Sequence, residues 1–526
     1  MSRASPSLAE REHLGERHYP SGTVAAQLRP GRLRFFRTVA ESVGVQGPTG
    51  GVVIGAALLA GISGGGTALV ELIAAVAMGF VAYAFVLFTR SFNSAGSVYG
   101  FTGAAVGPWF GFVSAFALLS VYIDFAGGVY ASTADEAQPA FGALGLHLPW
   151  QLYAVVAFLS VSALAYLDIK VSSAIVLVME IGAMAVVVAI SVVVLAKGGY
   201  HGHAFSSAPF RPNGSSLSVL GLGVVFSFSA FSGFEAAATL GEESARPERA
   251  VPLAVGVSLG VVALYEVGVA FVVTNAYPSV RQLASSAVPL VSVTDSFVAP
   301  WVGDVVNFAA VVSSFGAALA CANGAARILF ALGRDGFGPR SLARTSTRTG
   351  SPAGALVLVA TASFGLLLPF LWEQAASQAV AIVLTYGADL IIAAYVLVVV
   401  AAITYALRSR IPLRRTVVLL VGLLVLGFIA KGTFVPFPAF PYNWDAIGAG
   451  ATLLLGGTLP LASPKLRLRL RSSPLLVLGK ARLMGSAPQL RGRPGPVPDW
   501  RRPTWTGAEA NDGRLGAGLG RGPGSL

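Results

Sequence analysis

Long apolar runs separated by short polar stretches dominate this sequence, and each run is apolar throughout, without alternation. A membrane-crossing helix needs about 20 mostly apolar residues, whereas a membrane β-barrel shows alternating apolar positions. The pattern therefore predicts an all-α integral membrane protein with twelve transmembrane helices. The expected helices cover residues 39–61, 66–90, 106–130, 151–168, 172–196, 217–240, 251–275, 304–330, 354–372, 379–406, 415–434 and 445–463.

Composition supports this reading, because 55% of the 526 residues are hydrophobic and only 11% are charged. Soluble domains carry about 25% charged residues, so this chain lacks the charge to cover a water-facing surface. The basic excess lies in tails and short loops rather than on a folded polar face, so no nucleic-acid partner is expected. The single Cys321 excludes an intramolecular disulfide and a cysteine-based metal cluster.

The distribution of Lys and Arg predicts the orientation. The short loops carry thirteen of these residues on one side, against four on the other, which are Lys197, Arg211, Arg281 and Lys431. Basic loops stay in the cytoplasm. We therefore expect a multi-pass protein of the cell membrane with both termini cytoplasmic.

Three regions follow from this division. Residues 1–38 form a cytoplasmic N-terminal tail, residues 39–463 form the twelve-helix domain, and residues 464–526 form a basic cytoplasmic tail. The last region is rich in Arg, Pro and Gly and lacks an apolar period, which predicts that most of it is disordered. Its "LRLRLR" stretch (466–471) either acts as a topology signal or contacts anionic membrane lipid.

Several kinds of chemistry lack their residues in this chain. The five histidines all lie in tails or outer loops: His13, His18, His147, His201 and His203. Ser-His catalysis and a His-based metal site are therefore not expected, and His201 and His203 lack a third ligand nearby. No Walker-type phosphate loop is present. We expect no enzyme activity, cofactor or metal, which leaves gradient-driven passage across the membrane, or a receptor or channel role.

Six acidic residues lie within the expected helices and outside their terminal turns: Glu71, Asp124, Glu180, Glu235, Glu266 and Asp389. An ionisable group at membrane depth usually faces a bundle interior or a water-filled cavity, so each is a functional candidate. The alternative for Glu180, Glu266 and Asp389 is a structural polar contact between helices. Glu71 lies close to an outer helix end, where water can reach it.

Two of the expected helices contain features that break helices. The sixth run reads "AFSGFEAAATLGEE" (230–243), in which Gly233 loosens the helix and Glu235 lies two residues further on. The first run contains "QGPTGG" (46–51), in which Pro48 removes an N–H and three glycines flank it. Broken helices expose backbone groups that are tolerated at mid-membrane only where they line a cavity.

Two such breaks facing each other form a receptor for a zwitterion, because a half-helix N-terminus holds a carboxylate and free carbonyls hold an ammonium. The breaks lie five helices apart, which predicts an inverted repeat of about 39–196 and 217–406, followed by two extra helices in 415–463.

These segments resemble a known family. "FSGFEAAATLGEESARPERAVP" (231–252) is similar to the sixth-helix signature of the amino acid–polyamine–organocation (APC) superfamily of permeases. "SAGSVYGFTGAAVGPWFGF" (94–112) and "CANGAARILFALGRDGFGP" (321–339) resemble the family's segments entering helix three and following helix eight. The resemblance implies a LeuT-like 5+5 fold and uptake or exchange of amino acids, often coupled to protons.

The resemblance also implies roles for particular residues. The backbone around Thr49, Gly50 and Gly51 would receive the substrate carboxylate, although the break reads Pro-Thr-Gly-Gly rather than the family's common Gly-Ser/Thr-Gly. Carbonyls near Ser229 and Ser232 would receive the amine, and Phe231 would form a gate or pocket wall. Gly233 lets the helix open. Glu235 matches the acidic residue associated with proton-linked gating. Glu180 is the polar mid-span residue of helix five, where some proton-coupled members carry a lysine.

The expected function is therefore secondary active transport of amino acids by alternating access, coupled to protons. The alternatives are a gradient-independent exchanger, a polyamine transporter, or a membrane nutrient sensor. Ser313 and Ser314 leave a sodium site open. Five side chains are candidates to shape the pocket: Tyr122, Asp124, Tyr386, Asp389 and Tyr395. An inward-facing aspartate would favour a cationic substrate, and an outward or paired one would favour neutral amino acids.

Overall fold

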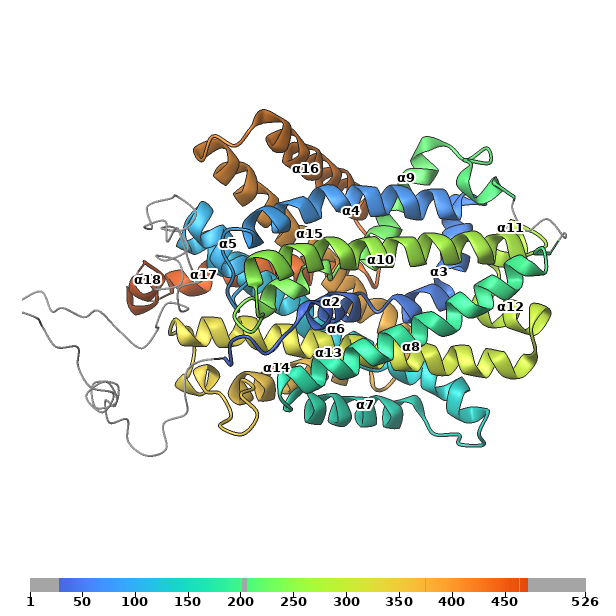
Figure 1. Ribbon diagram of the computed structural model, residues 1–526, viewed down its shortest axis with the longest axis horizontal. Coiled ribbons are helices and arrows are strands. Elements are labelled where there is room, and N and C mark those ends of the chain that lie inside the picture. Colours follow the sequence, from blue (N-terminus) through green and yellow to red (C-terminus); the bar gives the residue numbers. More distant parts are fainter. Residues whose placement is uncertain (1–27, 201–205, 374, 463, 472–526) are drawn as a thin grey trace, which may run out of the picture. The chain divides into compact units, whose positions relative to one another are not determined.

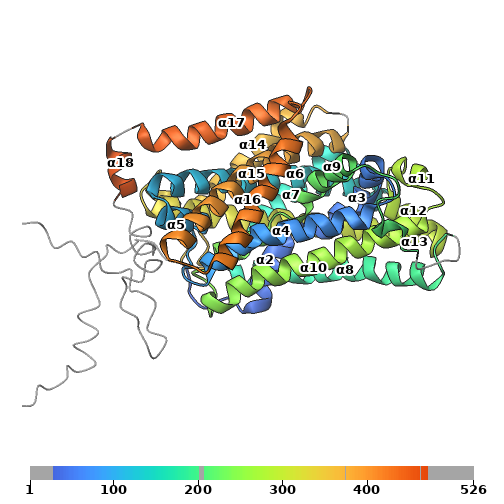
Figure 2. The ribbon, with the colours of Figure 1, turned by 90° about the horizontal axis from the view of Figure 1, so that it is seen from above.

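The computed structural model describes residues 28–200, 206–373, 375–462 and 464–471, and in these residues the fold is all-helical. The one departure is an isolated bridge between Leu33 and Ser244. Figures 1 and 2 show a bundle in which most long helices run alongside one another. Within the described ranges, nine helices are long and apolar enough to cross a membrane, or eleven if two bent pairs each count as one.

The first half of the bundle contains the helices up to residue 196, with a short 3-10 turn (η1) at Ala208–Phe210. The helices are α2 (Phe35–Gln46), α3 (Pro48–Ser63), α4 (Thr67–Thr89), α5 (Val98–Ala105), α6 (Pro108–Gly142), α7 (Trp150–Ala165) and α8 (Ile169–Ala196).

The second half begins at α9 (Leu217–Phe228), which is followed by the 3-10 segments η2 (Ser229–Phe231) and η3 (Phe234–Leu240). Then come α10 (Pro247–Ala276), α11 (Val280–Ala284), α12 (Pro289–Phe297), α13 (Pro300–Arg334), η4 (Arg340–Ala343), α14 (Ala353–Leu367), η5 (Leu368–Phe370) and α15 (Ala376–Arg408). The chain ends with α16 (Leu413–Phe434), α17 (Asn443–Thr458), η6 (Leu459–Leu461) and α18 (Pro464–Arg471).

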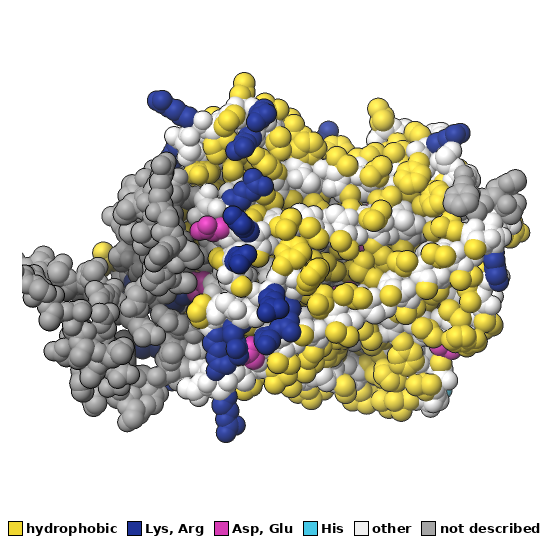
Figure 3. Space-filling model, viewed as in Figure 1, with side chains coloured by type: hydrophobic (Ala, Val, Ile, Leu, Met, Phe, Trp, Pro, Cys, Tyr) yellow, Lys and Arg dark blue, Asp and Glu magenta, His cyan; other side chains and the backbone are white. Residues whose placement is uncertain are grey.

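The centre of the bundle is formed by α6 and α13, which pack against each other and are each 72% buried over their most apolar window. Helix α16 is only 22% buried, and α8 and α14 are each 28% buried. The apolar side chains that these outer helices expose make much of the surface in Figure 3 hydrophobic. Such a surface is stable in lipid and not in water, so the protein is a multi-pass membrane protein.

Lys and Arg side chains gather in a band toward one end of the bundle in Figure 3. We call this end the basic end, which is where α13 ends at Arg334 and α15 ends at Arg408. Helices α11 and α12 lie at the opposite end (Figure 1).

Each of the twelve predicted segments coincides with a helix or a bent helix pair, but several predicted boundaries are wrong. Helix α6 runs to Gly142 rather than 130, and α2 begins at Phe35, inside the predicted N-terminal tail. The segment predicted as 151–168 is a helix of 16 residues, which is short for a membrane span. The predicted disordered tail begins with the helix α18, and its remainder, from residue 472, lies outside the described residues.

Candidate functional site

The first predicted break exists. Helix α2 ends at Gln46, Gly47 adopts a left-handed conformation with φ +50°, and α3 starts at Pro48. Glycine tolerates positive φ without the clash of a Cβ, and proline suits a first helical position because its missing N–H would have no partner there. The same span bends again inside α3, where Phe35–Val53 and Gly55–Ser63 make an angle of 70°. The first turn of α3 therefore begins inside the bundle, where its N–H groups point away from any preceding helix.

The second predicted break also exists. After α9 and η2, Ser232 is extended (φ −75°, ψ 149°) and Gly233 is left-handed with φ +108°. The chain then continues as 3-10 helix from Phe234 to Leu240, with all seven side chains buried. The sequence signal of glycine next to a carboxylate thus marked a true interruption.

The two breaks lie against each other. A Cβ placed on Gly233 would lie 2.6 Å from Val45 Cγ1 and 3.1 Å from the Gln46 backbone nitrogen, so only glycine fits here. The hydroxyl of Ser42 joins the same elements, because it donates to the Phe234 carbonyl (2.6 Å) and accepts from the Ala237 N–H (2.8 Å). The breaks are therefore one continuous structural site.

Glu235 connects this site to the central helices. Its Oε1 accepts a hydrogen bond from Tyr122 of α6 at 2.8 Å, and its Oε2 accepts one from Tyr395 of α15 at 2.6 Å. The Gly233 N–H donates to the same Oε2 at 3.1 Å. Since Glu235 is fully buried, these donors take the place of the water that would otherwise solvate its carboxylate. The side chain thus holds the second break to α6 and α15.

The residues predicted to receive a carboxylate form a second polar cluster, at the first turn of α3. The Thr49 N–H donates to Ser313 Oγ at 3.3 Å, and Ser313 donates onward to Glu180 Oε2 at 2.9 Å. The Thr49 hydroxyl bonds to the Tyr265 hydroxyl at 2.9 Å.

Gly50 faces the next residue of α13. A Cβ on Gly50 would lie 2.5 Å from Ser314 Oγ and 3.1 Å from Glu136 Oε1, and Ser314 donates to that same Glu136 oxygen at 2.9 Å. The structure therefore brings Glu180, a separate candidate in the sequence analysis, next to Thr49 and Gly50, and adds Glu136 from α6.

The residues predicted to bind the substrate amine are either buried or already hydrogen-bonded within the protein. Ser229 is exposed, but its carbonyl already accepts from the N–H (3.1 Å) and the hydroxyl (2.6 Å) of Ser232. Phe231 and Ser232 are buried, whereas Gly51 of the first break is exposed. Their role in binding stays a prediction, and it requires these Ser232 contacts to rearrange.

The remaining predicted acids divide into two groups. Glu71 is 5% exposed and not solvated, so the expectation of a water-accessible position is wrong; its charge acts on Glu266 of α10. Glu266 Oε1 lies 3.8 Å from a Cβ built on Gly51. Asp124 instead faces Gly387 of α15, and Asp389 interacts with Asp445 of α17. Asp124 of α6 therefore packs against α15, and Asp389, which lies on α15, is near Asp445 of α17.

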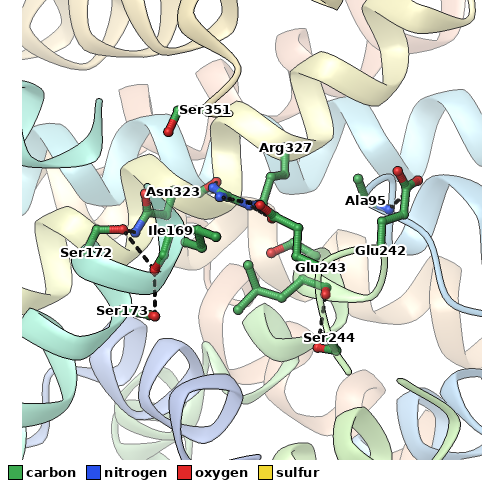
Figure 4. Close-up of polar contacts among 12 residues, drawn as sticks. Ala95, Ile169, Ser172, Ser173, Glu242, Glu243, Ser244, Asn323, Arg327 and Ser351 are labelled. Atoms are coloured by element: carbon green, nitrogen blue, oxygen red, sulfur yellow. Dashed lines mark hydrogen bonds and ion pairs between the residues drawn. The ribbon is translucent and has the colours of Figure 1, made fainter. Parts of the chain in front are cut away.

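A buried charge cluster closes the basic end (Figure 4). Arg327 of α13 is 2% exposed and donates through Nε and Nη2 to Glu243, and through Nη1 to the Asn323 carbonyl at 2.8 Å. Asn323 reaches Ser172 of α8 at 3.3 Å, and Glu41 of α2 lies within electrostatic reach of Arg327. We call Glu41, Glu243, Asn323 and Arg327 the basic-end cluster.

Further contacts tie loops together at this end. Arg334 pairs with Glu242 at 2.7 Å, and although burial opposes ionisation, this guanidinium lowers the pKa of the Glu242 carboxyl. Burial likewise opposes ionisation of Asp168, but hydrogen bonds and charge from Arg32 and Arg29 lower the pKa of its carboxyl. Every residue of η3, which follows the second break, is buried, and so is every residue of α5.

Sequence reasoning missed Glu136, Glu41 and Arg327. Glu136 follows the predicted end of the third run at 130, where adjacent acids and Pro139 read as a loop. Glu41 and Arg327 lie at the ends of predicted runs, where the sequence does not distinguish a membrane position from a loop. Their opposite charges on different runs are the signal that could have indicated their proximity. His201 and His203 lie outside the described residues.

Comparisons with known proteins agree with this architecture. The sequence profile described as "Amino acid permease" matches residues 41–454. The branched-chain amino acid permease BcaP of Bacillus subtilis (strain 168) is 28% identical over 373 residues, which cover 66% of this chain and 75% of BcaP. The BcaP of Lactococcus lactis subsp. cremoris (strain MG1363) is 25% identical, over 59% of this chain and 70% of its own length.

A more distant relative carries a different substrate in its name. The mitochondrial cationic amino acid transporter 3 of Arabidopsis thaliana is 25% identical, over 62% of this chain and 55% of its own length. These relatives are named as permeases and transporters and not as enzymes. Because the family profile covers most of the sequence, including both helix breaks and the residues around them, the chain belongs to the amino acid permease family.

Proposed function

We propose that this protein is a secondary active transporter that carries amino acids across the cell membrane by alternating access, with both termini in the cytoplasm and transport coupled to protons. The observation that supports the proposal is the contact between the two helix breaks, in which the last turn of α2, directly before the Gly47 break, packs against Gly233. In an inverted repeat of 39–196 and 217–406, these are equivalent positions in the two halves.

The substrate carboxylate would bind at the first turn of α3, around Thr49, Gly50 and Gly51, where the helix dipole favours negative charge. The amine would bind carbonyls near Ser229 and Ser232 once the second break opens, with Phe231 as the wall between site and interior. Opening at Gly233 must rearrange the hydrogen bonds of Glu235. A carboxylate that loses buried donors during opening can take up a proton instead.

The packed basic end supports a conformation that is closed toward the cytoplasm. Gly51 is exposed on the other side of the break, whereas η3 and the basic-end cluster are buried. Alternation would then require the basic-end cluster to separate while α3 closes over the substrate.

We further propose that the substrate has a neutral side chain. The neighbours found for Asp124 and Asp389 are Gly387 of α15 and Asp445 of α17, which do not belong to either break. The two BcaP relatives, which carry "branched-chain amino acid" in their names, agree with an apolar side chain. The cationic amino acid transporter 3 supports the alternative of a cationic amino acid or polyamine.

The test is uptake by purified protein in lipid vesicles, with leucine, lysine and spermidine as probes. We expect leucine accumulation when the outside is acidic, abolished by an agent that dissipates the proton gradient. Glu235→Gln should lose gradient-driven accumulation but retain counterflow of leucine. Glu248→Gln, an exposed acid at the start of α10, is the matched control and should behave as the wild type.

Each alternative has its own outcome in this experiment. Accumulation that follows a sodium gradient would assign coupling to Ser313 and Ser314, and counterflow without any gradient dependence would indicate an exchanger. A protein that is thermally stabilised by leucine but moves none would be a nutrient sensor.

A further inference from the structure

Two carboxylates lie beside the first turn of α3, where the substrate carboxylate is expected to bind. The inference drawn from them rests on the proposed function. Glu136 lies against Gly50 so closely that a Cβ on Gly50 would be 3.1 Å from its Oε1. Glu180 is reached from the Thr49 N–H through one hydroxyl, that of Ser313. The first turn of α3 thus has a carboxylate behind each of two consecutive residues.

Among the residues that the structure describes, neither carboxylate has a basic partner. The ion pairs of the described residues join Arg29 and Arg32 to Asp168, Arg327 to Glu243, and Arg334 to Glu242, all toward the basic end. Glu136 Oε2 and Glu180 Oε1 are buried and lack a hydrogen-bond partner in the described part of the chain. Only the hydroxyls of Ser314 and Ser313 bond to the other two oxygens.

The surroundings add more negative charge. Asp135 precedes Glu136 on α6, Glu180 faces it from α8, and Glu266 approaches Gly51 from α10, while α13 contributes hydroxyls only. The ionisable group that α10 adds beside Thr49 is the phenol of Tyr265. Buried like charges without a cation cannot all be ionised, because each raises the cost of charging the next.

We propose that Glu136 is a proton-dependent gate for the carboxylate subsite, which admits the substrate carboxylate only when Glu136 carries a proton, with Glu180 sharing that proton. A substrate carboxylate entering at Gly50 would meet an ionised Glu136 at hydrogen-bonding distance, which is strongly unfavourable in a buried site. A protonated Glu136 instead offers an O–H donor to the same group. The proton enters from the outer solution with the substrate and leaves when the substrate leaves.

This gate predicts the direction of the pH dependence. An amino acid should bind more tightly as pH falls, because each bound carboxylate is accompanied by one proton, with a limit of about tenfold in affinity per pH unit. A substrate that has an amine but no carboxylate would show the opposite trend, since ionised Glu136 and Glu180 would attract it.

The experiment uses the full chain in lipid vesicles and measures the KM for leucine between about pH 5.5 and about pH 8. The wild type should show a KM that rises by at least about tenfold over this range. Glu136→Gln resembles the protonated acid in shape and charge, so it should keep a low KM at the upper pH and lose most of the pH dependence. Glu136→Asp retracts the carboxylate from Gly50 and should keep the dependence in weaker form, which guards against a folding defect. Glu248→Gln is the control.

A second measurement separates the gate from a structural role. Leucine added to unbuffered wild-type protein in detergent at about neutral pH should draw protons from solution, and Glu136→Gln should draw fewer. An unchanged pH profile and unchanged proton uptake in Glu136→Gln would overturn the gate, as would a wild-type KM that falls with rising pH. If the wild type binds and transports no amino acid at any pH, the proposed function fails instead, so the two failures are distinguishable.

Discussion

Gly50 and Gly51 are adjacent in the first break, but we predict that an added methyl group is tolerated at Gly51 and not at Gly50. A Cβ on Gly50 would lie 2.5 Å from Ser314 Oγ, whereas the nearest atom to a Cβ on Gly51 is Glu266 Oε1 at 3.8 Å, an ordinary contact. Both glycines lie in α3, so both alanines gain up to about 1 kcal/mol of helix propensity.

The cost at Gly50 follows from what must move. Ser314 can avoid the new methyl only by turning its hydroxyl away, which breaks its 2.9 Å bond to Glu136. A buried acceptor left without its donor costs about 1–3 kcal/mol. After the gain in propensity, Gly50→Ala should destabilise the protein by up to about 3 kcal/mol, while Gly51→Ala should be neutral or stabilising by up to about 1 kcal/mol.

The assay heats the detergent-purified variants and measures the fraction that remains folded by size-exclusion chromatography. Gly50→Ala should melt below the wild type, and Gly51→Ala at or above it. In combination with Ser314→Ala, which removes the obstructing oxygen, Gly50→Ala should cost nothing further, so the two changes should be non-additive. Equal melting of the two glycine variants, or full additivity with Ser314→Ala, would refute the reasoning.

Three other perturbations address the remaining contacts. Arg327→Met leaves Glu243 buried without its partner and should lower thermal stability by about 3–5 kcal/mol, part of which Glu243→Gln in the same chain should restore. Tyr122→Phe removes one donor to Glu235 and should cost about 1–3 kcal/mol in the same melting assay, with slower leucine uptake. The lowered pKa of Asp168 means that its stabilising contribution is present above the carboxyl's ordinary pKa and is lost as the pH falls through the lowered value. The melting temperatures of Asp168→Asn and wild type should therefore converge below about pH 4, and a constant difference down to lower pH would contradict this.

Helix positions and both breaks could be predicted from the sequence because they depend on local chemistry. Apolar runs identify helices by length, and the glycines around Pro48 and at Gly233 interrupt them wherever the rest of the chain lies. Even the contact between the breaks was predictable, since exposed backbone at membrane depth needs a polar partner.

The partners of the buried acids could not be predicted, since they depend on the relative rotation of helices that are apolar on every side. Asp124 and Glu136 lie on the same helix α6, yet the first faces Gly387 of α15 and the second faces Gly50 of α3. A helix with polar residues on one face reveals its orientation, whereas α6 has lipid-compatible residues all round. The end of α6 was missed for a related reason, because "TADEAQP" (133–139) has the composition of a loop and becomes helical through packing against α13.

The buried acids on the two sides of the breaks have different kinds of partner, and this bears on how the two ends can open. Toward the basic end, Glu243 and Glu242 pair with arginines, which stay charged at any physiological pH and favour the ionised form of each carboxyl. Around the first turn of α3, Glu136 and Glu180 bond only to serine hydroxyls, which accommodate either the ionised or the protonated acid.

Separating Arg327 from Glu243 in a dry interior would cost several kcal/mol, but opening the basic end admits water that solvates both charges and offsets much of that cost. The basic end should therefore open cooperatively. Either Arg327 and Glu243 are paired in an interior without water, or they are separated and both are hydrated. Neutralising Glu136 while substrate binds favours closure of α3 over the site. The change of charge at Glu136 can then drive a conformational switch that also opens the basic end, where the arginines keep their charge.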